Sequence, residues 1–408
     1  MRGEAHPTLH YGWVIVAAGL VVGACGYGTY YSFTLFYSHL VAEFGWSRTA
    51  VSGAMSLGLV AYGFFALPMG WCVDRFGPRA TVVAGGVLFG GGTALGAGIG
   101  ELWQLYALYG GITAMGMGTI WAPLVATVSR WFVTRRGLAV GVTVLGGSVG
   151  VFVFAPLTEA LIAHVGWREA YLWLGLISGG LITCFALLLV RDPAGKGLRP
   201  YGADAAAPET AARTPLPVPQ VFGLGRIVRS LRFWHMSVTF GLWWFAGAIV
   251  YVHIAPFLAE KGFDAGFAAL ALMLFATGNC AGRIAMGLLC DRVGGRAAYQ
   301  LSLLLAAAAM SGFALAGGSA GLLAAAFVVG FGFGGALTQI TTIAVALFGT
   351  ASAGALMGAV LAVIGLVGSG GPLASGMIYD ATQSYAPAFH AGAGVFLLSL
   401  ALSAGLRR

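Results

Sequence analysis

The sequence predicts an all-α membrane protein with twelve transmembrane helices arranged in two six-helix halves. Composition, recurring apolar stretches and an internal repeat support this prediction. Of the 408 residues, 59% are hydrophobic and only 8% are charged, whereas a soluble domain carries about 25% charged residues. The 66 glycines also fit a membrane bundle, because small residues let membrane helices approach one another closely.

Apolar stretches of about 20 residues or more recur along the chain, and each can cross roughly 30 Å of hydrocarbon. The first stretch is long and lacks a cleavage site, so we expect a retained helix rather than a signal peptide. The twelve predicted spans are residues 11–40, 48–73, 79–99, 102–129, 137–164, 169–191, 232–259, 266–290, 297–316, 319–347, 353–380 and 386–406.

A proline-rich polar segment separates the sixth and seventh spans. Its alanines, glycines and scattered charges are typical of a poorly ordered linker, and a docking or regulatory segment is the alternative. We therefore expect an N-terminal six-helix half at 1–191, a cytoplasmic linker at 192–231 and a C-terminal six-helix half at 232–408.

The pattern Gly-x-x-x-Asp-Arg-x-Gly-x-Arg occurs at Gly70–Arg79 and again at Gly287–Arg296. Each copy joins the second and third predicted helices of its half. Half-to-half repeats of this kind are typical of secondary transporters, whose substrate site lies between the halves near the membrane midplane.

The lysines and arginines indicate how the chain is oriented in the membrane. If both repeats face the cytoplasm, seventeen of the 21 Lys and Arg residues lie on that side, as do both termini. Arg48, Arg168 and Lys261 lie on the opposite side. This asymmetry follows the positive-inside rule, so the net charge of +8 indicates topology rather than nucleic-acid binding.

The five cysteines all fall in apolar segments. Their odd number and their spacing indicate neither disulfides nor a metal site. The sequence also shows no cofactor loop and no nucleophile constellation, so we expect a protein that is not an enzyme and that needs no cofactor.

Arg283 is the strongest candidate for a binding residue. An apolar stretch, Phe267–Cys280, precedes it, and Asp291 follows eight residues later, which places Arg283 roughly 12 Å inside the membrane boundary. A cation at such depth costs about 2.5–3.5 kcal/mol on insertion scales, so a ligand or a pathway must compensate. The alternative is an arginine satisfied by helix carbonyls and a neighbouring carboxylate.

The chemistry of Arg283 favours a monocarboxylate. Its planar guanidinium matches one carboxylate group in a bidentate fashion. An oxalate-type dianion calls for a second cation, and no other Lys or Arg lies in the interior of a predicted span. Asn279 lies one turn earlier on the same helix face, where it can orient the guanidinium or donate to a substrate hydroxyl or keto group.

Other side chains are weaker candidates for the same pocket, and helix packing is the alternative for each. His253 is the only histidine well inside a span, where it could bind substrate or take a proton. Glu43, Glu159 and Asp380 lie near helix ends, where we expect solvated or gating roles. The remaining substrate-binding candidates are Tyr27, Tyr31, Trp121, Leu145 and Phe333.

The two repeated loops resemble the inter-helix motif of the major facilitator superfamily. The resemblance implies that Asp74 and Asp291 cap or pair with neighbouring cytoplasmic helix ends and hold one conformation. It implies that the arginines of the motif pair with carboxylates or lipid headgroups. These arginines are Arg75, Arg79, Arg292 and Arg296.

Two further stretches narrow this resemblance. Tyr11–Val14 (Tyr-Gly-Trp-Val) and Trp131–Gly147 (Trp-Phe-Val-Thr-Arg-Arg-Gly-Leu-Ala-x-Gly-x-Thr-x-x-Gly-Gly) resemble the paired signatures of the monocarboxylate transporter family, including bacterial relatives near the oxalate–formate antiporters. This resemblance implies that Arg283, on the eighth helix, binds substrate. The family often has an aspartate at the position of Asn279, and its animal members have a lysine at that of Tyr31. These departures leave the anion-binding part intact, but Asn279 cannot carry a proton as the family's aspartate does.

The sequence therefore predicts a proton-coupled symporter of small monocarboxylates, such as L-lactate or pyruvate, that works by alternating access. We expect a monomer in a bacterial inner membrane, with lipid and no nucleic acid as partner. An exchanger or uniporter of organic anions, including oxalate-type dianions, is one alternative. A non-transporting membrane sensor built on a transporter fold is another.

Overall fold

The computed structural model describes residues 10–203, 224–316, 318–348 and 353–406. Within these ranges the regular structure is helical, apart from one isolated bridge between Phe132 and Tyr201. Ten helices in this part of the chain are long and apolar enough to cross a membrane. The predicted all-α membrane architecture is therefore confirmed.

These ten helices are consistent with the twelve predicted spans. One of them, Gly137–Ala186, covers both the fifth and the sixth span. Within it Gly166 has a φ of 81° and a ψ of 162°, which breaks the long helix α7 (Arg136–Ala186) in two. The ninth predicted span is α12 (Gly295–Leu315), which is not among the ten.

The helices of the N-terminal half lie close to the predicted spans. The first span comprises two helices that meet at Ser32, and the fourth comprises four short elements. The N-terminal elements besides α7 are α1 (Tyr11–Tyr31), α2 (Phe33–Phe44), α3 (Arg48–Leu95), η1 (Gly96–Gly98), α4 (Leu102–Leu105), the π-helical η2 (Tyr106–Thr113), α5 (Ala114–Met117), α6 (Trp121–Trp131) and the short η3 (Pro193–Lys196).

The helices of the C-terminal half are also close to prediction, and the eleventh span is divided at Ser369. Besides α12, they are α9 (Leu224–Val228), α10 (Leu231–Glu260), α11 (Ala265–Val293), α13 (Ser319–Phe348), α14 (Ala353–Gly368), α15 (Gly370–Thr382) and α16 (Ala386–Ser403).

Two glycines show why the repeated motif needs its glycine spacing. Gly77 and Gly294 occupy the same place in the two copies, and their φ angles are 83° and 84°. Residues with a Cβ rarely adopt this backbone conformation. Each glycine thus turns the chain from the second span of its half into the third.

The charged side chains of the motif are only partly described. The side chains of Asp74 and Asp291 lie outside the described part of the structure, so their capping role stays a prediction. The Arg75 guanidinium lies 5.4 Å from the Trp71 ring centroid. Among the other three arginines, Arg79 and Arg292 are exposed and Arg296 is half-buried.

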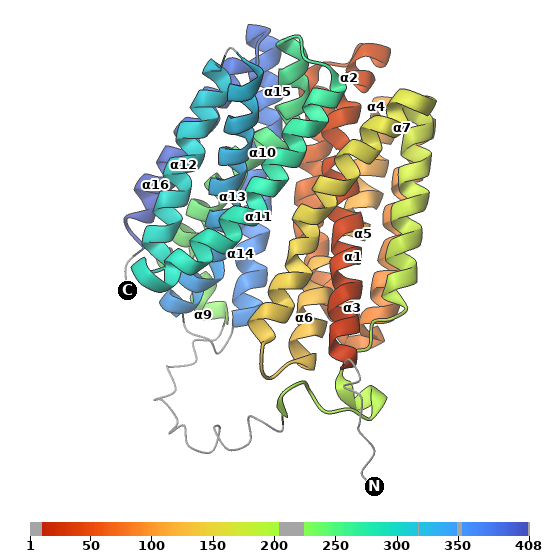
Figure 1. Cartoon of the computed structure of the whole chain (residues 1–408), viewed down its shortest axis with the longest axis vertical. Helices are drawn as coiled ribbons and strands as arrows, with labels where there is room; N and C mark the ends of the chain where they lie inside the picture. Colours follow the sequence, from red (N-terminus) through yellow and green to blue (C-terminus); the bar gives the residue numbers. More distant parts are fainter. Residues whose placement is uncertain (1–9, 204–223, 317, 349–352, 407–408) are drawn as a thin grey trace.

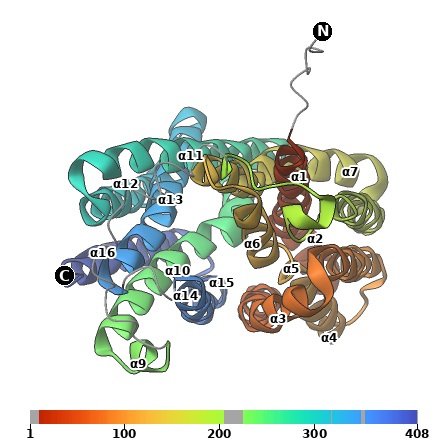
Figure 2. The same cartoon turned by 90° about the horizontal axis from the view of Figure 1, so that it is seen from below.

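The two halves lie side by side, and their boundary runs through the centre of the molecule (Figures 1 and 2). Along one side of this boundary α7 packs against α11, and along the other α3 packs against α14 and α15. Gly376 on α15 lies so close to the Arg48 and Thr49 backbone that a Cβ there would lie 2.8 Å from the Thr49 Cα. The first and last described residues lie at the same end of the bundle, the lower end in Figure 1.

The beginning of the predicted linker is packed against the N-terminal half rather than loose. The backbone N–H of Tyr201 donates to the Trp131 carbonyl at 2.8 Å, and the Tyr201 carbonyl accepts from Val133 at 3.0 Å. The Tyr201 ring lies beside those of Phe132 and Trp13, with centroids 5.5 and 6.1 Å away. These contacts of Tyr201 hold the first part of the linker against the N-terminal half despite its prolines. Residues 204–223 lie outside the described part of the structure.

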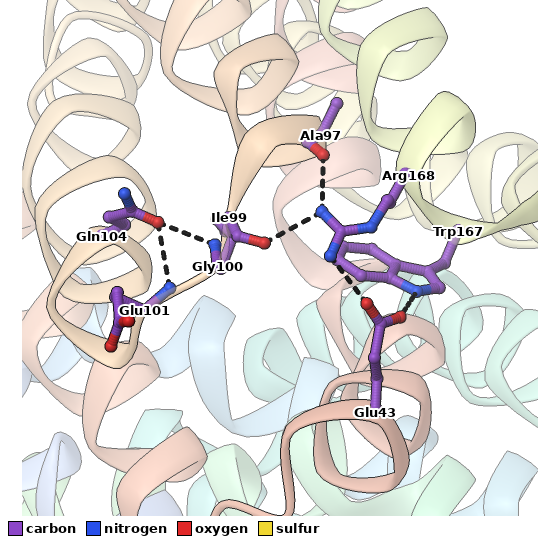
Figure 3. A network of polar contacts seen from close by, with 8 residues as sticks. All are labelled: Glu43, Ala97, Ile99, Gly100, Glu101, Gln104, Trp167 and Arg168. Carbon is purple, nitrogen blue, oxygen red and sulfur yellow. Dashed lines mark hydrogen bonds and ion pairs between the residues drawn. The ribbon is translucent and has the colours of Figure 1, made fainter.

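A polar network holds the opposite end of the N-terminal half together (Figure 3). Arg168 contacts Glu43 at 2.6 Å and donates to the carbonyls of Ala97 and Ile99 at 3.0 and 2.9 Å. Trp167 donates to the other Glu43 oxygen at 2.6 Å. Glu43 thus joins α2 to α7 within one half.

Candidate functional site

A cavity of about 150 Å³ lies between the two halves. Eight aromatic side chains surround it, and Arg283 is the only charged residue among its described lining residues. The lining residues are Tyr27, Tyr31, Leu59, Tyr62, Gly63, Ala66, Trp121, Ala122 and Gly147 from the N-terminal half, and Trp243, Trp244, Tyr251, Arg283, Phe333, Leu337, Ile340, Gly358, Leu361, Ile364 and Gly365 from the C-terminal half.

Arg283 is held by one contact from each half. Its Nε donates to Asn279 Oδ1 at 2.9 Å, one turn earlier on α11. Its Nη1 donates to the Val144 carbonyl of α7 at 3.2 Å. A guanidinium has five N–H donors and no acceptor, so these two bonds leave donors for a ligand. Both of these partners are neutral, so the guanidinium charge is not neutralised by them.

Asn279 lies behind Arg283 rather than on the cavity wall. It is 1% exposed, and its Oδ1 also accepts a hydrogen bond from the Ser148 hydroxyl of α7 at 3.1 Å. Its Nδ2 has no partner among the described residues.

Aromatic rings from both halves form the walls. Tyr31 and Tyr251 stack across the boundary with ring centroids 4.1 Å apart. The hydroxyls of Tyr27 and Tyr62 lie 3.1 Å apart, within hydrogen-bonding distance. Opposite them, Phe333 lies 5.4 Å from Trp244, centroid to centroid. The cavity is therefore mostly apolar, with hydroxyls and one guanidinium as polar groups.

The structure brings together most of the candidates named from the sequence. Tyr27, Tyr31, Trp121, Arg283 and Phe333 all line the cavity. Leu145, on α7, is not among the described lining residues. Gly147, two residues later on α7, lines the cavity, and residues two apart on an α-helix point to opposite sides.

His253 is likewise not among the described lining residues. It is fully buried at the boundary between the halves, where its Nε2 donates to the Pro372 carbonyl at 3.1 Å and lies 3.4 Å from the Ser52 hydroxyl. A carbonyl can only accept, so Nε2 carries a proton. This placement makes His253 an interface residue, not a wall of the cavity.

The halves are joined at the end where α2, α10 and α15 meet. Asp380 accepts hydrogen bonds from the backbone N–H groups of Arg48 and Thr49 at 3.1 and 2.9 Å. The Thr34 hydroxyl donates to the Val252 carbonyl at 2.8 Å. These contacts hold the two halves together at this end, which we call the closed end of the bundle.

The comparisons with known proteins identify the family. The model of the Major Facilitator Superfamily matches residues 19–372. Monocarboxylate transporter 13 from Bos taurus is 32% identical over 401 residues, which cover 96% of this chain and 88% of that protein. The chain belongs to the monocarboxylate transporter family of this superfamily. It is a multi-pass membrane transporter rather than an enzyme, as the sequence predicted.

Other relatives support the assignment of this chain to the monocarboxylate transporter family. Monocarboxylate transporter 11 from Homo sapiens is 30% identical, and the match covers 98% of this chain and 84% of that transporter. The oxalate:formate antiporter of Oxalobacter formigenes is 27% identical, covering 72% of this chain and 66% of the antiporter. The chain has the same fold as a bacterial homologue of the human lysosomal transporter Spinster, solved in an inward-facing and unoccupied conformation. The TM-score is 0.71 and the identity 15%, and the match covers 99% of this chain and 96% of the homologue.

Sequence reasoning missed several residues of this transporter's cavity. Tyr62, Trp243, Trp244 and Tyr251 all contribute to the walls. The last two are seven positions apart on α10, which places them two turns apart on one helix face. That spacing was a usable signal for α10, whereas Tyr62 had none beyond being a polar aromatic inside a span.

The described lining residues include no acidic side chain. The described residues also include no cluster of His, Cys, Asp and Glu that could hold a metal ion. The described part of the site can thus bind an anion through Arg283, but it includes no carboxylate to carry a proton.

Proposed function

We propose that this chain transports small monocarboxylates, such as L-lactate or pyruvate, in symport with protons and by alternating access. The observation that carries the proposal is the single unneutralised guanidinium of Arg283 in a cavity between the two halves. One positive charge in a low-dielectric site favours one negative charge, and secondary transporters bind substrate between their halves.

The cavity volume suits a small acid. An apolar cavity of about 150 Å³ accepts benzene, which has as many non-hydrogen atoms as lactate or pyruvate. The donors left free on Arg283 bind the carboxylate, and the apolar walls surround the remaining carbon atoms. Tyr31 and Tyr251 line the cavity, so their hydroxyls can bond to a substrate hydroxyl or keto group.

The closed end of the bundle is the extracellular end in this proposal. Arg48 and Lys261 lie at that end, whereas the basic residues of both repeats lie at the other, which the positive-inside rule assigns to the cytoplasm. The proposal makes this an inward-facing state in a bacterial inner membrane, with both termini cytoplasmic. Rocking of the halves breaks the Asp380 contacts and opens the cavity outward.

Proton symport compensates the charge of the substrate. An anion that enters a negative-inside cell works against about 2.3 kcal/mol per elementary charge at 100 mV. A co-transported proton makes the step electroneutral.

Exchange of organic anions is the second candidate. The amide of Asn279 stands next to Arg283 where the family often has an aspartate, and the described cavity walls include no carboxylate that could take up a proton. An exchanger balances charge without a proton, as one anion leaves for each that enters.

Uptake into proteoliposomes distinguishes these possibilities. With the purified protein and an inside-alkaline pH gradient, symport predicts that labelled L-lactate accumulates and that a protonophore abolishes the accumulation. Counterflow that persists after the gradient has collapsed, without accumulation, supports the exchanger. Uptake equal to that of protein-free liposomes in both assays refutes transport of this substrate.

A further inference from the structure

Ser148 contributes to the site from the opposite half of the molecule without reaching the cavity. It lies on α7, is 5% exposed, and is not among the described lining residues. Its hydroxyl lies 3.1 Å from Asn279 Oδ1 on α11. The hydroxyl of Ser148 is therefore linked to the site through Asn279.

The chemistry of the neighbours fixes which way the Asn279 amide points. Arg283 Nε can only donate, so the atom facing it at 2.9 Å must be the amide oxygen. Ser148 contacts the same oxygen, so its hydroxyl must donate. The amide nitrogen is then turned toward a buried place where it has no described partner, which is unfavourable by itself.

The backbone of Asn279 has little freedom to adjust. Gly334 on α13 packs against the Asn279 carbonyl so closely that a Cβ at Gly334 has no room. The orientation of the amide thus depends on its two hydrogen bonds. One comes from Arg283, the residue to be oriented, and the other comes from Ser148.

Ser148 and Asn279 form one of two matched contacts between α7 and α11. Val144 and Ser148 are one turn apart on α7, and Asn279 and Arg283 are one turn apart on α11. Asn279 pairs with Ser148, and Arg283 pairs with the Val144 carbonyl. Together the two contacts set the guanidinium plane relative to the N-terminal half.

We propose that Ser148 is a positioning residue for substrate binding, which orients the Asn279 amide and through it the Arg283 guanidinium. This inference rests on the proposed function, because it assumes that Arg283 binds the substrate carboxylate. Without the hydroxyl, only the bond from Arg283 Nε holds the amide oxygen, so the amide and the guanidinium can shift together. The guanidinium then loses its fixed orientation before substrate arrives.

The experiment compares Ser148→Ala with a matched control, Ser178→Ala. Ser178 also lies on α7 and is fully buried, but its hydroxyl donates to the Leu174 carbonyl of its own helix at 2.5 Å. For Ser148→Ala we expect KM for L-lactate uptake to rise about three- to tenfold with little change in kcat, as for the loss of one hydrogen bond. The control should keep the wild-type KM, and Ser148→Thr should restore much of the affinity.

A double-mutant cycle separates positioning from general destabilisation. In an Asn279→Ala background, Ser148→Ala should have no further effect on KM, because its partner is already absent. Additive effects of the two substitutions, or an unchanged KM in Ser148→Ala, would overturn the inference.

Failure of the inference differs from failure of the proposed function. If Arg283→Ala loses uptake while Ser148→Ala keeps the wild-type KM, only the role of Ser148 is refuted. If Arg283→Ala keeps full uptake, the proposed site itself is wrong, and the role of Ser148 is refuted with it.

Discussion

Asp380 of the C-terminal half caps the N-terminus of α3 in the N-terminal half, where its carboxylate accepts the backbone N–H of Thr49 at 2.9 Å. The Thr49 hydroxyl donates to the same oxygen at 2.5 Å. A carboxylate at a helix N-terminus also interacts favourably with the helix dipole. Arg48 strengthens the contact by donating to the Tyr385 hydroxyl at 2.8 Å. This cap is one of several polar links between the halves at the closed end.

Asp380→Asn should weaken this closed end, because it removes the negative charge and one acceptor. Hydrogen bonds to charged groups contribute about 1.5–3 kcal/mol, so we expect roughly a tenfold shift toward a conformation open at this end. Spin labels at Glu101 and Ala265, both exposed at this end, report the change as longer distances in double electron–electron resonance. A cysteine-free background supplies the reference.

Asp264→Asn is the matched control for this change. Asp264 caps α11 at the same end by accepting the Phe267 N–H at 2.7 Å, but within its own half. The distance distribution should match the wild type in this control. Equal distributions in Asp380→Asn and the wild type would show that the cap does not hold the halves together.

Asn279→Asp should weaken substrate binding in a pH-dependent way. An aspartate accepts the same hydrogen bonds from Arg283 and Ser148, but its charge neutralises the guanidinium and repels the substrate anion. At neutral pH we expect KM for lactate to rise by about tenfold or more. At acidic pH the aspartic acid is neutral like the amide, so KM should fall back toward the wild-type value.

Uptake measured across pH at saturating and limiting lactate gives this KM. The wild type, measured over the same range, is the control for the pH dependence of the substrate itself. A KM ratio between variant and wild type that stays constant with pH would argue against charge neutralisation.

The ring of Tyr31 should matter more than its hydroxyl for the contact between the halves. It stacks on Tyr251 at 4.1 Å, and such pairs contribute about 0.5–1.5 kcal/mol beyond their buried area. We expect Tyr31→Ala to slow lactate uptake several-fold and Tyr31→Phe to keep most of the rate. Equal losses in the two variants would show that the hydroxyl is the important group.

Gly334→Ala should destabilise the protein because the new methyl group overlaps the Asn279 backbone. Overpacking of this kind costs about 1–3 kcal/mol, which lowers Tm by several degrees in detergent. Gly312→Ala on α12 is the control, since a Cβ there meets no described atom within 4 Å. An unchanged Tm in Gly334→Ala would mean that α11 and α13 can move apart at this point.

The sequence was most informative where membrane physics constrains it directly. The apolar stretches gave the spans because each must cross the hydrocarbon, and the repeat placed Gly77 and Gly294 at equivalent turns. Arg283 was identified because a cation inside the membrane is energetically unfavourable, and Asn279 because it lies one helical turn from Arg283.

The sequence was less informative where the rotation and packing of helices decide the outcome. Nearly every residue in a membrane span is apolar, so periodicity does not show which face of a helix meets the cavity. For this reason Tyr62 and Ser148 were not found, and His253 was assigned to the pocket although it lies in the contact between the halves. The packing of Tyr201 against the N-terminal half was likewise not predicted, because Tyr201 lies in a proline-rich segment.

Lactate uptake by Arg283 variants in proteoliposomes tests the central claim most directly. Arg283→Ala should abolish saturable uptake, and Arg283→Lys should retain only weak uptake, because an ammonium keeps the charge but loses the planar bidentate geometry. Arg229→Ala, an exposed arginine outside the cavity, should transport like the wild type. Undiminished uptake by Arg283→Ala would contradict the assignment of the substrate site.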